Sequence, residues 1–507
     1  MKYRNPIISG FHPDPSVCRV GDDYYLVTSS FEYFPGIPVY HSKDLVNWRQ
    51  IGHCLNRSTQ IELTKAAPNS MGIYAPTIRY HEGYFYVITT NITYGLAKGG
   101  NFVVRTNDPY GEWSDPVWID LPGIDPSLFF GEDGKVYYTG AYKDIFMCEI
   151  DLNTGKVLSD PLSIWGGTGA ADPEGPHLYK IGDYYYLFIS EGGTSQGHMI
   201  TGARSKNIWG PYEPCPRNPV LSNRSMPLPI KATGHTDFIQ AHDGSWWAVC
   251  LGIRPVPYPD RHHLGRETFL APVKWDDDQW PIIGNDGTID MEMEADCLPE
   301  FKFAERNVRD DFEESRLDYC WNFIYNPDPK LWSLNDRQGF LTLKGNEISL
   351  DDKETSAWLG RRQEHMECSV RTLLEFEPKN DGEEAGLSIF LNCDHHYEIA
   401  LTQLNGKKKI IFRRRIGSLW KVENCLDYES SSVLLQLDAD SHTYSFSYSE
   451  GEGRATRSMG SGEVHYLSTE VGGRFTGIYI VLYATGNGMK NTEPAYFDWF
   501  DYQAIQQ

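Results

Sequence analysis

The chain has 507 residues, a formal net charge of −23 and 13 % aromatic residues. This length is too great for one hydrophobic core, so two or more domains are expected. The acidity argues against nucleic acid or an anionic membrane as a partner, because phosphate binding requires a basic surface. The many Tyr and Trp residues are typical of β-rich folds with flat apolar platforms, and a neutral ligand is the simplest expectation.

The N-terminus and the cysteines indicate where the protein works. Residues 1–6 lack the apolar region of a secretory signal, and no run approaches 18 apolar residues, so no membrane span is expected. The 10 cysteines are scattered without a Cys-x-x-Cys pair, as in proteins of reducing compartments. We therefore expect a cytoplasmic location, with no membrane or nucleic-acid partner. Homo-oligomer formation stays open.

The first 290 residues repeat one pattern five times. Each repeat begins with a short polar or proline-containing motif, followed by a β run, a turn and a second, aromatic β run. Repeats of four strands at a period of about 50–60 residues predict a β-propeller, here with five blades. The motifs are centred on Asp14, Ala75, Asp125, Glu174 and His235.

The remainder of the chain predicts a second β domain. The aromatic repeat stops near Asp290, and the charged residues 291–309 are typical of a linker. From 310 to 507, many short alternating strands predict a β-sandwich of the concanavalin-like or jelly-roll type. The sequence thus predicts an all-β fold with a propeller at 1–290 and very few helices.

Propeller geometry brings the acidic motifs together. The innermost strands converge on the axis, so Asp14, Asp125 and Glu174 are expected to face one central pocket, with His235 beside them. Turn chemistry explains each motif singly, but not why acids occupy three of five equivalent places. Two chemistries stay open: a calcium site built from oxygen ligands, and glycoside hydrolysis by a pair of acids. Acids on separate blades suit flanking a ligand better than caging an ion.

Three motifs in order resemble glycoside hydrolase family 43: His12–Ser16, Gly123–Ser127 and Pro173–Lys180. The resemblance extends over nearly the whole chain, including the sandwich of the β-xylosidase branch. It implies an inverting mechanism in which Asp14 is the general base that activates water and Glu174 is the general acid. Asp125 would raise the pKa of the acid and orient it. Base and acid would then lie roughly 6.5–9.5 Å apart.

The resemblance also implies a set of substrate-binding residues. Phe31 would form part of the apolar wall of the sugar pocket, Thr194 would line it, and Arg266 would bind sugar hydroxyls and keep the surroundings of Glu174 cationic. An ordinary core position for Phe31 and an ordinary ion pair for Arg266 are the alternatives. His235 would lie under the pocket and is a candidate ligand of Ca²⁺; no cofactor is otherwise expected to be required.

Tyr74 and Ala75 bear on the choice of sugar. Familiar xylosidases of the family carry Trp before the Ala-Pro motif, whereas this chain has Tyr74, whose smaller ring would reshape the pocket wall. The form Ile73–Pro76 resembles a branch that includes α-L-arabinofuranosidases as well as β-xylosidases, so dual activity is an expected alternative.

The sequence therefore predicts an exo-acting glycosidase that removes terminal pentoses from short xylo- or arabino-oligosaccharides. β-1,4-Xylosidase is the first interpretation, and α-L-arabinofuranosidase or dual activity is the alternative. A non-catalytic carbohydrate-binding propeller is the alternative from another class, although such a protein would be expected to lose one of the acids. The Gly-rich segment Ala484–Met489 is expected to close the propeller mouth, with an ordinary turn as the alternative.

Overall fold

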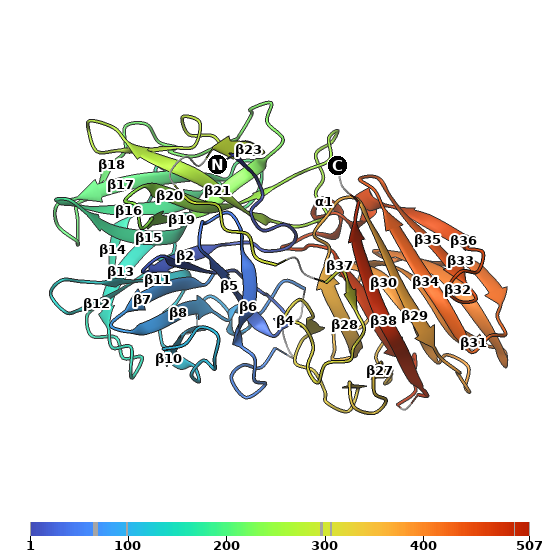
Figure 1. Cartoon of the computed structure of the whole chain (residues 1–507). Coiled ribbons are helices and arrows are strands. Elements are labelled where there is room, and N and C mark those ends of the chain that lie inside the picture. Colours follow the sequence, from blue (N-terminus) through green and yellow to red (C-terminus); the bar gives the residue numbers. More distant parts are fainter. Residues whose placement is uncertain are drawn as a thin grey trace.

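The computed structural model describes residues 2–63, 69–97, 100–294, 298–304, 307–490 and 492–505. Figure 1 shows two bodies, a propeller in blue to yellow-green and a sandwich in orange to red. Helical structure in the described residues is confined to two 3₁₀ turns (Ile92–Tyr94 and Val464–Leu467) and the one-turn helix α1 (Thr469–Gly472). The all-β prediction is confirmed. Within the same residues, no helix is long and apolar enough to cross a bilayer.

The propeller consists of five four-stranded antiparallel sheets, one for each repeat of the sequence. Each blade runs from an innermost strand outward in chain order, and the polar turns between aromatic strands set the hairpins. The strands of blades one to three are β2 (Ser16–Val20), β3 (Asp23–Val27), β5 (Gly36–Ser42), β6 (Arg49–Leu55), β7 (Thr77–His81), β8 (Tyr84–Thr90), β9 (Asn101–Thr106), β10 (Val117–Ile119), β11 (Ile124–Phe130), β12 (Val136–Tyr142), β13 (Asp144–Ile150) and β14 (Leu162–Trp165). Blades four and five contain β15 (Glu174–Ile181), β16 (Tyr184–Glu191), β17 (Met199–Ser205), β18 (Glu213–Pro214), β19 (Lys231–Gln240), β20 (Trp246–Ile253), β21 (Glu267–Trp275) and β22 (Pro281–Ile283).

Apolar layers between neighbouring blades close the ring. Aromatic and aliphatic side chains of β3 pack with those of β20 and β21, so that Tyr24 and Trp247 belong to one buried cluster between the first and last blades. Similar clusters lie between the second and third, third and fourth, and fourth and fifth blades. Burial of this apolar area is the main term that stabilises the ring. Strand β1 (Lys2–Arg4) pairs with β23 (Glu292–Glu294) and links both ends of the propeller segment.

The C-terminal part forms the predicted sandwich. One sheet has the order β26-β27-β38-β29-β34-β35-β36, with β24 added against β38, and the other has the order β28-β37-β30-β31-β32-β33. The strands of the first sheet are β24 (Arg309–Asp310), β26 (Trp332–Ser333), β27 (Leu341–Lys344), β29 (Cys368–Glu375), β34 (Ser432–Ala439), β35 (Thr443–Ser449), β36 (Arg457–Glu463) and β38 (Pro494–Ala504). Those of the second are β28 (Ala357–Arg362), β30 (Glu384–Asn392), β31 (His395–Leu404), β32 (Lys407–Ile416), β33 (Leu419–Asp427) and β37 (Tyr479–Thr485).

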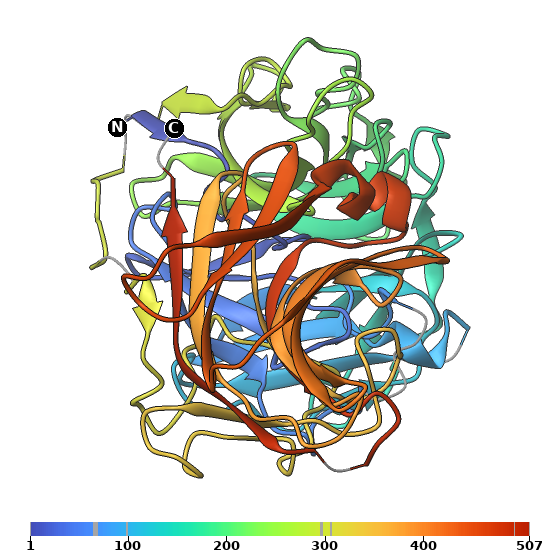
Figure 2. The same ribbon diagram turned by 90° about the vertical axis from the view of Figure 1, so that its right-hand side faces the viewer.

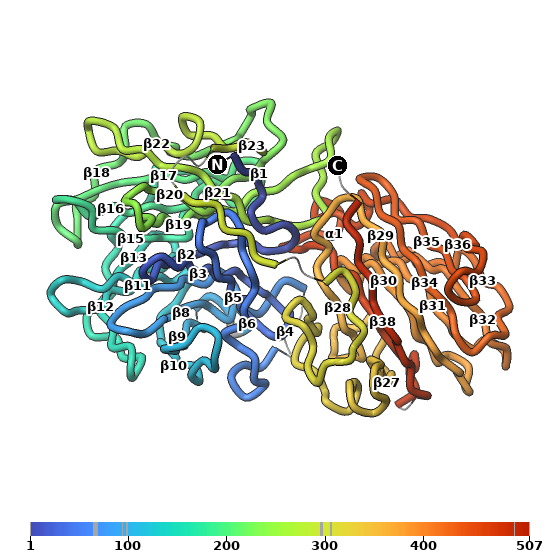
Figure 3. Tube along the Cα trace, in the orientation of Figure 1, coloured from blue at the N-terminus to red at the C-terminus, as the bar shows by residue number. Residues whose placement is uncertain are grey.

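The sandwich lies along one side of the propeller (Figures 1 and 3), and it stands in front of the propeller in the view turned by 90° (Figure 2). Strand β4 (Tyr33–Phe34) of the propeller pairs with β25 (Phe323–Ile324), which lies between β24 and β26 in the chain. The rings of Tyr33 and Tyr479 stack with centroids 4.0 Å apart. Residues 295–297 and 305–306 of the predicted linker lie outside the described residues, and the domain boundaries at 290 and 310 stay a prediction.

Candidate active site

Asp14, Asp125 and Glu174 lie where the innermost strands of three blades begin. Asp14 precedes β2, Asp125 is the second residue of β11 and Glu174 is the first residue of β15. The strand register shifts next to Asp125 and Glu174, and φ is 57° at Asp14, 53° at Asp125 and 59° at Gly175. Left-handed backbone is costly for residues other than glycine and is concentrated at functional sites. The local bulges thus place acidic side chains at the axis.

Asp14 is a buried carboxylate surrounded by donors. The Ser29 hydroxyl donates a short hydrogen bond to its Oδ2. Arg266 lies within 3.3 Å of Oδ2 through Nη2 and within 3.2 Å of Oδ1 through Nη1. These contacts suit an ionised carboxylate, as a general base must be. The ion pair considered for Arg266 is therefore present, and it joins Arg266 to the predicted base.

Asp125 and Glu174 lie on adjoining segments, and the ion pair of Arg266 is made with Asp14 and not with them. The Gly175 N–H donates to Asp125 Oδ2 over 3.1 Å, which joins the two acidic segments. Burial, helped by the charge of Asp14 and opposed by His235, raises the pKa of Asp125 to about 6. Burial and the charge of Asp125 raise the pKa of Glu174 well above its usual value, against the effect of Arg266. A raised pKa favours the protonated form of Glu174, which is the form that a general acid requires.

Two histidines complete the polar part of the pocket. His235 Nδ1 lies 3.9 Å from Asp14 Oδ1, and its ring rests against Gly175, where an added Cβ would come within 3.1 Å. The fully buried His198 was not predicted, and its Nε2 lies 3.7 Å from Glu174 Oε1. Burial lowers the pKa of His198 to about 3, so this ring is neutral beside the predicted acid.

The axis below His235 is occupied by a buried ion pair. Arg79 donates to Asp237 Oδ2 over 2.7 Å and to His177 Nδ1 over 2.9 Å. In the part of the chain that the structure describes, no group of three or more His, Cys, Asp or Glu side chains has the arrangement of a metal site. These residues do not form a calcium cage of protein ligands, and a guanidinium nearby would oppose a divalent cation. The calcium role of His235 stays a prediction.

An apolar wall faces the acids, and the sandwich supplies part of it. The ring of Phe31 lies 5.4 Å from that of Tyr74 and 5.8 Å from that of Phe475, and Tyr74 and Phe475 are also 5.8 Å apart. The guanidinium of Arg266 stacks over Phe475 at 4.7 Å from its centroid. Phe31 belongs to a buried cluster and also borders Arg266, so it is a core residue at the edge of the pocket. Phe475 was not predicted.

The prediction that Ala484–Met489 closes the mouth is not what the structure shows. This segment ends β37 and turns back on the sandwich, where Gly486 N bonds Asn346 O and Asn487 Nδ2 bonds Gly382 O. The segment that contributes to the aromatic wall is instead residues 473–478, which precede the other end of β37. Its Gly-rich sequence around Phe475 was the signal that could have identified it, but composition alone does not tell which end of a strand faces the propeller.

Thr194 and Ala75 occupy the remaining predicted positions. Thr194 Oγ1 accepts a 3.0 Å hydrogen bond from Arg266 Nη1, which places Thr194 on the same side as Asp14. Ala75 is buried just before β7, at the axial end of blade two. The structure thus brings Asp14, Arg266 and Thr194 into direct contact.

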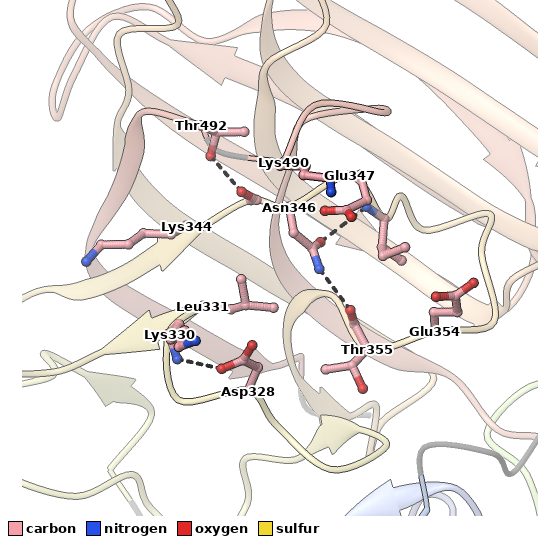
Figure 4. Close-up of a pocket in the computed structure, with 12 residues that line it drawn as sticks. Asp328, Lys330, Leu331, Lys344, Asn346, Glu347, Glu354, Thr355, Lys490 and Thr492 are labelled. Atoms are coloured by element: carbon pink, nitrogen blue, oxygen red, sulfur yellow. Dashed lines mark hydrogen bonds between the residues drawn. The ribbon is translucent and has the colours of Figure 1, made fainter.

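A surface recess of about 620 Å³ lies in the sandwich and is separate from this site. Figure 4 shows its charged and polar lining, including Lys344, Glu347 and Lys490. No aromatic side chain lines it, so it lacks the platform on which proteins usually stack a sugar. We therefore place the functional site at the propeller axis.

Comparison with known proteins identifies the family of both domains. The family model "Glycosyl hydrolases family 43" matches residues 3–281, and the model "Beta xylosidase C-terminal Concanavalin A-like domain" matches residues 309–503. The chain belongs to glycosyl hydrolase family 43. It is therefore a glycoside hydrolase with a propeller and a C-terminal sandwich, and the predicted resemblance is confirmed.

Relatives of this family 43 enzyme are similar over most of its length. A non-reducing-end α-L-arabinofuranosidase of Bacteroides ovatus is 45 % identical over 507 residues, which covers 99 % of this chain and 95 % of that protein. A β-xylosidase of Bacillus subtilis is 37 % identical, with 79 % of each chain covered. The crystal structure of a xylan β-1,4-xylosidase from Bacillus halodurans superposes with a TM-score of 0.94 at 33 % identity, covering 99 % of this chain and 100 % of that one.

Proposed function

We propose that the protein is an inverting exo-glycosidase that removes one terminal pentose from short oligosaccharides. The observation that carries the proposal is the contrast between two acids at one mouth: burial and the charge of Asp125 raise the pKa of Glu174, whereas Asp14 is held by Ser29 and Arg266. In this mechanism Glu174 protonates the glycosidic oxygen. Asp14 removes a proton from the water that attacks the anomeric carbon from the opposite face.

Asp125 acts on the acid and not on the sugar in this proposal. Its negative charge, together with burial, keeps the pKa of Glu174 high, so that the proton is still present at neutral pH. The hydrogen bond from Gly175 N to Asp125 keeps the two segments in register. The predicted separation of Asp14 and Glu174, roughly 6.5–9.5 Å, leaves room for the attacking water.

The second part of the proposal concerns which terminal pentose the enzyme removes. The rings of Phe31, Tyr74 and Phe475 offer an apolar surface for the C–H face of a pentose, opposite hydroxyl-binding groups such as Arg266. A β-1,4-linked xylose remains the first candidate. An α-L-arabinofuranoside is the second, and it is favoured by Tyr74 and by the 45 % identity to the Bacteroides ovatus α-L-arabinofuranosidase.

Hydrolysis of 4-nitrophenyl β-D-xyloside and 4-nitrophenyl α-L-arabinofuranoside tests the proposal. Wild type is expected to cleave at least one of them and to release the sugar with inverted anomeric configuration, seen by ¹H NMR. Asp14→Ala is expected to lose this activity, whereas Glu174→Ala is expected to lose activity chiefly on xylo- or arabino-oligosaccharides, whose leaving group needs a proton. The ratio of the two wild-type rates assigns the sugar. A wild type that binds pentosides but cleaves neither these nor xylo-oligosaccharides would be a binding propeller instead.

The remaining expectations stay predictions. We expect a cytoplasmic enzyme that acts on short imported oligosaccharides, and cell fractionation tests this location. The oligomeric state is checked by light scattering.

A further inference from the structure

Ser70 is a fully buried residue at the point where the sandwich meets the pocket wall. It is 1 % exposed and has a φ of 65°. Its hydroxyl donates to the carbonyl of Phe475 over 2.8 Å and accepts from the N–H of Phe475 over 3.1 Å. One side chain of the propeller therefore satisfies both backbone groups of the sandwich residue whose ring borders the pocket.

The backbone of the same residue fixes the other wall aromatic. The hydroxyl of Tyr74 donates to the Ser70 carbonyl over 3.2 Å, so it points at this serine and is not free to bind sugar in this arrangement. The rings of Tyr74 and Phe475 meet nearly at right angles, with an interplanar angle of 80°. Ser70 thus holds two of the three aromatic rings of the wall.

Glu32 in turn holds Ser70. Both carboxylate oxygens of Glu32 lie 3.1 Å from the Ser70 N–H, and the side chain is buried directly after Phe31. Paired hydrogen bonds join Phe31 and Ile73 (3.0 and 2.9 Å), which fastens the chain around Ser70 to the segment that carries the third ring. The Glu32 carbonyl accepts from Tyr325 N at 2.8 Å, so this segment is also tied to the sandwich side.

We propose that Ser70, held by Glu32, is a positioning residue that sets the spacing of Tyr74 and Phe475 and thereby the affinity of the pocket for the terminal sugar. The inference rests on the proposed function. It assigns Ser70 a role in substrate binding and none in proton transfer, because its contacts are to the aromatic wall and not to Asp14 or Glu174.

The test compares Ser70→Ala with wild type. The substitution keeps the Cβ and the backbone strain and removes only the hydroxyl. A hydrogen bond is worth about 1 kcal/mol, so losing the contact to Phe475 is expected to raise KM for the cleaved nitrophenyl pentoside about 5–10-fold with kcat within about twofold. Because Ser70 acts through Phe475, the double variant with Phe475→Ala is expected to be no worse than Phe475→Ala alone.

Asn326→Ala is the matched control. Asn326 also joins the two bodies by two hydrogen bonds, donating to Ile61 O at 2.9 Å and accepting from Leu63 N at 2.5 Å, without contacting the wall aromatics. It is expected to lower Tm while leaving KM unchanged. If Ser70→Ala behaves in the same way, Ser70 is only an interface contact and the proposal is overturned.

Two further outcomes are decisive. Multiplicative effects of Ser70→Ala and Phe475→Ala on KM would show that Ser70 does not act through Phe475, which also overturns the proposal. If Ser70→Ala does not fold, Ser70→Gly removes the hydroxyl while relieving the positive φ, and the same rise in KM is expected. If wild type cleaves no pentoside, the proposed function fails; weaker binding of xylose or arabinose to Ser70→Ala, measured by calorimetry, then still tests the positioning role.

Discussion

The propeller mouth and the central strands β30 and β31 of the sandwich both bury carboxylates, yet the pKa values of these groups are shifted in opposite directions. At the mouth, the ion pair of Arg266 goes to Asp14, and the pKa values of Asp125 and Glu174 are raised. In the sandwich, Glu398 contacts Arg413 at 3.2 Å and His396 at 2.5 Å. Burial there is overcome by these cations, and the pKa of Glu398 falls below its usual value.

The comparison shows that burial alone does not decide what a carboxyl group does. Burial raises the pKa at both places, and the number of cations in contact determines the outcome. Where carboxyls outnumber cations, one of them keeps a proton and can perform chemistry. Where cations match carboxyls, as for Arg413 and His396 with Glu384 and Glu398, the ion pairs stabilise the fold.

The largest expected effect is that of Glu174→Gln, which removes the proton donor and keeps the shape. We expect kcat/KM for xylobiose or an arabino-oligosaccharide to fall by about 10²–10⁴, since general acid catalysis contributes this much. The loss should be much smaller with 4-nitrophenyl glycosides, because nitrophenolate leaves without protonation. Equal losses with both kinds of substrate would contradict the assignment of Glu174 as the acid.

Arg413→Met tests whether the ion pairs of the buried sandwich carboxylates stabilise the fold. It leaves Glu384 and Glu398 without their shared cation, and we expect the free energy of unfolding to fall by about 3–5 kcal/mol. At 25 °C, kcat/KM should remain within twofold. Arg414→Met, one residue along the same strand, removes only outer ion pairs to Glu423 and Glu463 and is expected to cost less than about 1 kcal/mol. Similar losses in both variants, measured by urea unfolding, would argue against the buried network.

Asp125→Asn removes one carboxylate from the propeller mouth and so brings the numbers of carboxylates and cations there closer together. Removal of the neighbouring negative charge lowers the pKa of Glu174, so the acid loses its proton at lower pH than in wild type. We expect the alkaline limb of the kcat/KM profile to move to lower pH and activity at pH 7 to fall about 10–100-fold. An alkaline limb that stays in place would show that Asp125 does not set the proton affinity of Glu174.

The sandwich cluster predicts a pH dependence of stability. Glu398 and Asp351, acting against burial, raise the pKa of His396 from 6.5 to about 9 in the folded protein. A raised pKa means that His396 contributes fully below pH 6.5 and that this contribution is lost as the pH rises through 9. The free energy of unfolding should decline over this interval by an amount on the order of 1–3 kcal/mol in wild type and less in His396→Gln.

The smallest effect is expected from metal removal. The described residues around His235 show no cluster of three metal-ligating side chains, and Arg79 lies next to His177 on the axis below His235. We expect EDTA to change kcat/KM by less than about twofold. A loss that added Ca²⁺ restores, and that His235→Asn abolishes, would instead make His235 a calcium ligand.

Much of the catalytic arrangement was predictable because its signals are local. Asp14, Asp125 and Glu174 each stand in a short motif at the start of a repeat, and ring closure of five repeats brings such positions together. Ser29 was less visible, although it lies in the small polar run before Phe31. His198 was missed because a single histidine in a loop carries no pattern of its own.

The sequence by itself therefore determined the two β domains, the family and the identity of the three acids, because period and motif are properties of neighbouring residues. Tertiary structure alone decided how the pocket is closed. Ser70 and Phe475 are 405 positions apart, and their contact depends on which end of the sandwich faces the propeller. It also decided the charge states, since these follow from burial and from which cations reach each carboxyl group in three dimensions.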